Sequence, residues 1–231
     1  NKAMKGYFTK KNTEAKKKLK EFRVSNLENY KEGNEFGLEI FKDIKFVDTK
    51  SKTIGIYGDI NEESASEMVY TLIALHEESI REAEVAEAEE EVSPEPIKVI
   101  ISTHGGVAHE MFSIYDTYRM VQQDCEIHTV GLGKVMSAGV VLLAAGTKGK
   151  RAIGKNCRVM IHPVAAASMG DLNDIENETK EVRLLQKMYI QALVENSNLT
   201  EAKIKRMLRK KVNVYISAEE AVKYGIADEI I

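Results

Sequence analysis

The sequence predicts an α/β fold in which short buried strands alternate with helices in layers. Runs rich in β-branched residues recur along the chain and lead into glycine, serine or histidine, at residues 53–59, 97–101, 127–130 and 157–162. A segment with apolar residues at helical spacing follows each of these runs. This alternation is typical of a sheet covered by helices, and a chain of 231 residues can bury one such core.

The predicted helices differ in how they should be buried. Residues 138–146 are almost wholly apolar, and a helix this short cannot cross a bilayer, so it should lie inside the protein. Residues 174–195 form the longest helical pattern, and its length suggests that it protrudes from the core. Near the C-terminus, Ser217 as N-cap, Glu220 at the capping-box position and Gly225 as the stop predict one more helix.

The net charge of −3 conceals two opposed blocks of charge. Residues 2–23 carry nine Lys and Arg against two Glu, which is typical of a tail or a surface helix. Its few aromatic residues are not interleaved with the basic ones, so this block does not indicate nucleic-acid binding. Residues 77–95 hold nine Glu and one Arg, which indicates a solvated helix extension or an exposed loop. We therefore expect a basic extension and irregular lead-in over 1–52 and one folded domain over 53–231, with an acidic insertion at 77–96.

Cysteine usage and hydropathy point to a reducing compartment. Cys125 and Cys157 are too few for a disulfide framework and lie in no metal-binding pattern, so both should be reduced thiols and no metal is expected. No apolar run approaches the roughly 20 residues of a membrane helix, and the N-terminus is lysine-rich, unlike a signal peptide. The expectation is a cytoplasmic protein that does not bind membranes.

Three segments carry the groups that amide hydrolysis needs, namely a nucleophile, a base and oxyanion donors. Ser137 stands where a glycine-bearing strand exit meets the start of the buried helix, and His162 ends a buried strand. Gly106 and the amide of Ala138 are the candidate oxyanion donors. Taken singly each signal is weak, because a serine at a helix start is more often a cap and a strand-end histidine is usually structural.

The other four histidines serve as internal controls. His76, His109 and His128 are interpreted as structural, whereas His104 lies beside the glycine pair and could reach the neighbourhood of the serine.

At these positions the chain resembles a known family, the proteolytic subunit of the Clp protease, ClpP. The resemblance covers about 53–231 as a divergent member, and its matching strings occur in order: Gly58-Asp-Ile-Asn61, Gly105-Gly106, Ile114-Tyr-Asp-Thr117, Ser137 with Leu142-Leu-Ala-Ala-Gly146, Lys148-Gly-Lys-Arg151, Arg158-Val-Met-Ile-His162, Asp174-Ile-Glu176 and Ser217-Ala-Glu-Glu-Ala221. The resemblance implies a ClpP/crotonase-type spiral of β-β-α units with a handle helix at 174–195. It also implies Ser137 as nucleophile, His162 as base, and Gly106 and Ala138 as oxyanion donors.

The chain departs from the family pattern at three places. Thr103-His104 precedes the glycines where the family has Ser-Pro, and the link from Gly131 to Ser137 is two residues longer. The family's third catalytic member is an aspartate shortly before the Ser217 helix, and Asn213 stands at that position. An asparagine can orient the imidazole but supplies no charge, and the same exchange in a charged triad costs about 10⁴ in rate. Asp171 and Asp174 are alternative carboxylates.

The resemblance further implies an assembly and a partner. Family members form heptameric rings that stack into a tetradecamer through the handle helix, and an AAA+ unfoldase feeds them unfolded proteins. On this reading the subunit itself needs no cofactor, and the partner uses the ATP. Two other classes stay open: a weak or inactive structural subunit of a mixed ring, and a virion-maturation protease or crotonase-type acyl-CoA enzyme on the same fold. No adenine-nucleotide signature supports the acyl-CoA alternative.

Overall fold

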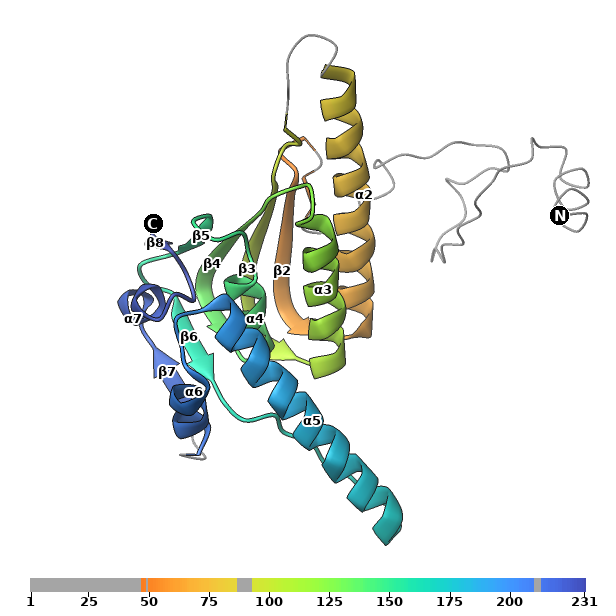
Figure 1. Ribbon diagram of the computed structural model, residues 1–231, viewed down its shortest axis with the longest axis vertical. Coiled ribbons are helices and arrows are strands. Elements are labelled where there is room, and N and C mark those ends of the chain that lie inside the picture. The colour runs from red at the N-terminus through yellow and green to blue at the C-terminus, as the bar shows by residue number, and fades with distance from the viewer. Residues whose placement is uncertain (1–46, 49, 87–92, 210–212) are drawn as a thin grey trace, which may run out of the picture. The chain divides into compact units, whose positions relative to one another are not determined.

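The computed structural model describes residues 47–48, 50–86, 93–209 and 213–231, which belong to one compact unit, Phe41–Ile231 (Figure 1). The basic extension predicted at the N-terminus lies outside the described residues. The strands are β1 (Val47–Asp48), β2 (Thr53–Ile60), β3 (Ile97–Gly106), β4 (Ile127–Met136), β5 (Arg151–Ile153), β6 (Arg158–Ile161), β7 (Val214–Ile216) and β8 (Glu229–Ile230). The helices are α2 (Glu62–Ala86), α3 (Ala108–Val121), α4 (Ala138–Ala144), α5 (Leu172–Asn196), α6 (Glu201–Leu208) and α7 (Ala218–Lys223).

The sheet is mostly parallel and confirms the predicted α/β class. Its strands follow the order β1-β2-β3-β4-β5-β8, and β6 pairs with β4 on one side and with β7 on the other. Strand β4 changes partner along its length: Thr129–Gly131 pair with β5, and Lys134–Met136 pair with β6. Gly133, with φ 64°, lies between these two stretches, where the strand must turn from one partner to the next.

Helix α4 is the apolar centre of the molecule. All seven of its residues are buried, and it packs against β3, β4, α3 and α5. Each fully buried aliphatic side chain, such as Leu142 or Leu143, stabilises the fold by roughly 1.5–3 kcal/mol. The first residue of α4 is therefore held by a rigid element.

Two strands run further than the sequence indicates. Strand β3 continues through the glycine pair to Gly106, and β4 continues to Met136, so the predicted ends of these strands at Ile101 and Val130 are wrong. The reason is long-range pairing: Thr103 pairs with Val135, both are fully buried, and β6 pairs with Lys134–Met136. The short elements β5, α6 and β7 leave no clear periodic pattern and were not predicted.

Both C-terminal helix predictions are confirmed. Helix α5 extends past the rest of the folded unit at its N-terminal end, as its length suggested (Figure 1). Helix α7 begins at a complete capping box, in which Ser217 accepts from the Glu220 amide and the Glu220 carboxylate accepts from the Ser217 amide. The acidic block continues α2 to Ala86 and then passes through residues 87–92, which lie outside the described residues.

A buried arginine, Arg151, joins the C-terminal ends of α4 and α5. Arg151 donates from Nη1 to the carbonyls of Ala144 and Asn196, the last turns of α4 and α5. Its Nε and Nη2 donate to the Asp228 carboxylate at 2.9 and 2.6 Å. The guanidinium beside Asp228 lowers the pKa of that carboxyl, so the pair is charged at neutral pH. Within the described residues, no helix is long and apolar enough to cross a membrane.

Candidate active site

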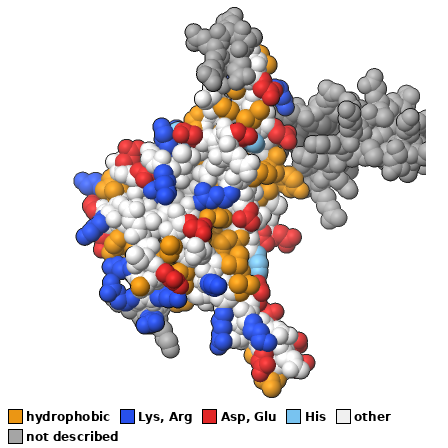
Figure 2. Space-filling model, in the orientation of Figure 1, with side chains coloured by type: hydrophobic (Ala, Val, Ile, Leu, Met, Phe, Trp, Pro, Cys, Tyr) orange, Lys and Arg blue, Asp and Glu red, His pale blue; other side chains and the backbone are white. Residues whose placement is uncertain are grey.

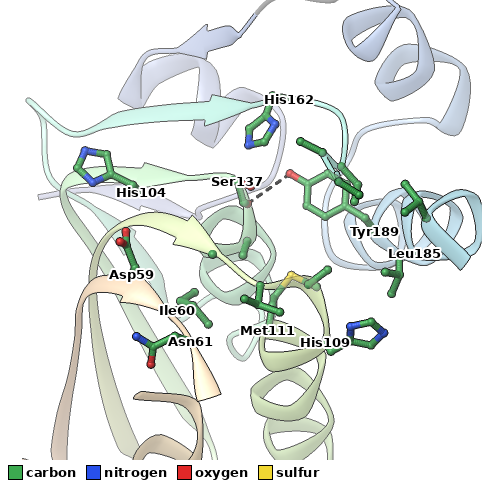
Figure 3. A pocket seen from close by; sticks show the side chains of 18 of the residues that line it. Asp59, Ile60, Asn61, His104, His109, Met111, Ser137, His162, Leu185 and Tyr189 are labelled. Carbon is green, nitrogen blue, oxygen red and sulfur yellow. Dashed lines mark hydrogen bonds between the residues drawn. The ribbon is translucent and has the colours of Figure 1, made fainter. Parts of the chain in front are cut away.

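The C-terminal ends of the parallel strands meet at one cavity of about 710 Å³ (Figure 3). Strand β2 ends there with Ile60, β3 with Gly106, β4 leads into Ser137, and β6 leads into His162. Helices α3 and α5 supply the opposite wall through Met111, Leu185 and Tyr189. The ends of parallel strands are where α/β folds bind their ligands, so the topology itself collects Ser137, Ala138, His162 and Gly106.

Ser137 has an unusual backbone conformation and does not serve as a cap. It occupies the N-cap position of α4, yet its side chain makes no capping hydrogen bond. Its φ is 53°, a conformation that costs a residue with a side chain about 1–3 kcal/mol and that neighbouring structure must hold in place. Its N–H donates to the Met160 carbonyl at 2.8 Å, and its own carbonyl accepts from Tyr189 Oη at 3.3 Å.

Tyr189 is fully suited to that role because it stays protonated. Only 4% of its surface is exposed, and burial raises its pKa well above the ordinary value. The hydroxyl therefore remains a donor, and it ties the serine backbone to α5 (Figure 3).

The glycine pair permits close approach to the serine. A Cβ on Gly105 would lie 2.6 Å from Ser137 Cβ, and a Cβ on Gly106 would lie 2.0 Å from the Ile60 carbonyl oxygen. Gly105 also has φ 102°, which residues with a side chain rarely adopt. The buried Thr103, which replaces the family's serine, accepts from the Gly105 amide at 2.9 Å and donates to the Gly58 carbonyl. The Thr103 hydroxyl therefore restrains the backbone next to the glycine pair, where the sequence departs from the Ser-Pro-Gly-Gly pattern of the family.

His162 is held in one tautomer by the backbone. Its Nδ1 lies 2.6 Å from the Pro163 carbonyl oxygen, and a carbonyl oxygen can only accept, so Nδ1 carries the proton. Nε2 of the neutral ring is then bare and able to take a proton, as a general base must. The ring lines the same cavity as Ser137, although no hydrogen bond joins the two side chains among the described residues.

Asn213 does not line the cavity, and it lies one residue beyond the last pair of the β6–β7 ladder. Strands β6 and β7 are antiparallel with Ile161 opposite Val214, so one further step of the same register sets His162 opposite Asn213. The Asn213 side chain is exposed, and Nδ1 of His162 is already engaged by Pro163. Of the alternative carboxylates, Asp171 is the N-cap of α5 and accepts from the Asp174 amide, and neither lines the cavity.

The remaining histidines separate into two groups. His76 pairs with Asp124, and His128 pairs with Glu126, both away from the cavity, in agreement with their structural interpretation. His104 lines the cavity, as the sequence allowed. His109 was interpreted as structural, but it also lines the cavity and lies 3.7 Å from Glu181 of α5.

Comparison with known proteins identifies the family. A sequence model of the Clp protease family matches residues 37–231. The chain belongs to the Clp protease family. It is 36% identical over 135 residues to the ATP-dependent Clp protease proteolytic subunit 3 of Frankia casuarinae, across 58% of this chain and 62% of that protein. It has the same identity over 135 residues to the ATP-dependent Clp protease proteolytic subunit of Deinococcus radiodurans, across 58% and 64%.

The chain thus spans less than two thirds of the length of these two Clp protease relatives. A further match lies outside the family: 54 residues are 80% identical to the large ribosomal subunit protein uL3 of Pelagibacter ubique, which is 23% of each chain. That match is too short to describe the Clp protease domain.

Two residues of this Clp protease family member were missed from sequence. Tyr189 holds the serine backbone, and Gln186 accepts at 2.8 Å from the amide of Val164, two residues after the histidine. Both lie on α5, whose apolar spacing indicated a helix but not which side chains would reach back to the strand ends.

Proposed function

We propose that this chain is a serine peptidase that hydrolyses peptide bonds of unfolded proteins or peptides through Ser137 and His162. The observation that supports it best is an uncapped Ser137 at positive φ, in the same cavity as a histidine whose Nδ1 is occupied. A helix start usually uses such a serine as a cap, and a hydroxyl left free at a strained position is typical of a nucleophile. Membership of the Clp protease family supports the same reaction class.

In the proposed reaction, Nε2 of His162 takes the hydroxyl proton as Ser137 Oγ attacks the peptide carbonyl. The amides of Gly106 and Ala138 would donate to the oxyanion, and His162 would then give its proton to the departing amine. A water, activated by the same imidazole, would release the acyl group from Ser137 and regenerate the hydroxyl. No step requires a cofactor in this subunit.

We further propose that the sites lie inside an oligomeric chamber built from heptameric rings, single or stacked as a tetradecamer. Helix α5 supports this assembly because it extends beyond the folded unit and exposes the apolar side chains of Leu172, Ile175 and Leu184. Met169, just before the helix, is exposed as well. Figure 2 shows hydrophobic, acidic and basic side chains interspersed on the protruding segment. A chamber would restrict substrates to unfolded chains, and an AAA+ unfoldase that consumes ATP would deliver them.

A second candidate function is a weak or inactive structural subunit of a mixed ring. Asn213 favours it, because the position across the ladder from His162 carries no charge to stabilise the imidazolium. The two functions differ in whether Ser137 becomes acylated, since both predict the same assembly.

The test is labelling by a fluorophosphonate probe together with the native mass of the particle. We expect Ser137 to be labelled in the wild type, no labelling of Ser137→Ala, and full labelling of Ser113→Ala, which alters an exposed serine of α3 outside the cavity. Assembly into rings without labelling would establish the structural subunit. A monomer that is never labelled would contradict both functions.

A further inference from the structure

One peptide unit next to His162 is hydrogen-bonded at both of its ends. The carbonyl of Pro163 accepts from His162 Nδ1 at 2.6 Å, and the amide of Val164, in the same peptide plane, donates to Gln186 Oε1 at 2.8 Å. The peptide bond is planar and stiff, so the orientation of its N–H fixes the orientation of its C=O. Gln186 therefore sets the direction in which the carbonyl meets the imidazole.

The segment that follows His162 has little else to hold it. Residues 163–168 belong to no helix or strand, and strand β6 ends at Ile161. Backbone outside a ladder can rotate its peptide planes unless a side chain restrains them. In the described part of the chain, the side chain that restrains this peptide comes from α5, whose inner half is anchored through the buried Leu185 and Tyr189 on either side of Gln186.

The chemistry of the glutamine matches this role. An amide N–H can be satisfied only by an acceptor, so the atom that faces Val164 must be the oxygen, and the orientation of the Gln186 amide is fixed. Its Nε2 is buried and has no hydrogen-bond partner among the described residues. A buried side chain that leaves one donor unsatisfied in order to make a single contact indicates that this contact is what the position requires.

We propose that Gln186 is a positioning residue for His162, acting through the Pro163–Val164 peptide in place of the carboxylate that position 213 lacks. The peptide keeps the proton on Nδ1 and leaves Nε2 bare, which is the tautomer that a base for Ser137 needs. Consecutive hydrogen bonds polarise one another, so the bond to Gln186 also makes the Pro163 carbonyl a better acceptor. This inference rests on the proposed peptidase function for its kinetic consequence but not for the tautomer itself.

The primary test measures the tautomer of His162 without reference to activity. We would record ¹⁵N shifts of the imidazole at alkaline pH, where the ring is neutral, and assign His162 as the resonance lost in His162→Gln. The expected wild-type ring carries its proton on Nδ1. Gln186→Met, which keeps the volume but removes the acceptor, should shift the ring towards Nε2–H, and Gln186→Glu, which restores an acceptor, should return it to Nδ1–H.

Gln191→Met provides the matched control, because Gln191 lies on the same helix and, among the residues that the structure describes, bonds only to the nearby Glu195. It should leave both the tautomer and the kinetics unchanged. For peptide hydrolysis, Gln186→Met should lower kcat about tenfold with KM within about twofold, which is the loss expected for one orienting hydrogen bond. Gln186→Glu should recover most of kcat.

The outcomes separate this inference from the proposed function. A wild-type ring that is protonated on Nε2, or a tautomer that Gln186→Met leaves unchanged, would overturn the role of Gln186 even if peptides are hydrolysed. The expected tautomers in a protein that never labels at Ser137 would uphold the role of Gln186 and refute the peptidase. If Gln186→Met does not fold, Gln186→Ala, which also removes the acceptor but adds no bulk, takes its place, and an Nδ1–H ring in that variant would overturn the role of Gln186.

Discussion

Asp228→Asn should destabilise the fold by about 3 kcal/mol at pH 7. The Asp228 carboxylate accepts from the Gly149 and Arg151 amides at 2.7 and 3.0 Å, and from two guanidinium nitrogens of Arg151. An asparagine turns one of its oxygens into an NH₂ group, which would face a donor in either orientation. Arg151, whose side chain is 5% exposed, would be left without its counter-charge, and such losses cost about 3–5 kcal/mol. Its two carbonyl acceptors remain, which places the estimate at the lower end.

The pH dependence of this loss has a definite sign. The pKa of Asp228 is lowered in the folded state, mainly by its hydrogen bond with Arg151, so the pair stabilises the fold above the unfolded pKa of about 3.9. That contribution disappears as the pH falls through the lower folded pKa. The difference between wild type and Asp228→Asn should therefore be full at pH 7 and shrink below about pH 4.

The assay is urea unfolding at equal protein concentration, followed at neutral and at acid pH. Glu201→Gln is the control, because Glu201 forms an exposed pair with Lys205 within α6 and should shift the midpoint little. A midpoint for Asp228→Asn that equals the wild type at pH 7 would refute the reasoning, as would a difference that grows in acid. A loss of stability here should also loosen the site, since Arg151 joins the ends of α4 and α5.

Three further predictions concern the site and the thiols. Asn213→Asp should speed peptide hydrolysis, because the register places position 213 across from His162; unchanged turnover would mean that the Pro163 carbonyl alone orients the ring. Gly105→Ala should abolish fluorophosphonate labelling of Ser137 while the far-UV spectrum stays folded, because the new Cβ would lie 2.6 Å from that of the serine; normal labelling would show that the glycine turn can relax. Burial raises the pKa of the Cys157 thiol to about 11, so it should react with a thiol reagent at pH 7 only after denaturation, and rapid labelling of native protein would contradict its buried position.

The sequence predicts the strand ends well because each depends on local chemistry. His162 follows a β-branched run and precedes a proline, and Ser137 precedes an apolar helix, so both positions can be inferred from their neighbours. The structure brings them to one cavity through parallel pairing, which the alternation of strands and helices implies. The capping box of α7 was equally predictable, because Ser217 and Glu220 act within one turn.

Contacts between distant segments account for what the sequence could not predict. Strand β4 runs on to Met136 because β6 pairs with it, and that partner lies more than twenty residues away. Gln186 reaches Val164 across 22 residues through a backbone amide, and a side chain that recognises backbone leaves no complementary residue to find. Position 213 could be located only by counting back from Ser217, and its relation to His162 required the register of β6 and β7.

The orienting group at His162 limits the rate that the proposed peptidase can reach. A carboxylate does two things for a catalytic imidazole: it fixes the tautomer, and its charge stabilises the imidazolium that forms in the transition state. The Pro163 carbonyl accomplishes the first, because it can only accept a hydrogen bond, so Nδ1 must carry the proton. It supplies a dipole rather than a charge for the second, so acylation of Ser137 should be slower than with a carboxylate but faster than with the wrong tautomer. A turnover between these limits, rising in Asn213→Asp and falling in Gln186→Met, is the signature that distinguishes a slow peptidase from an inactive ring subunit.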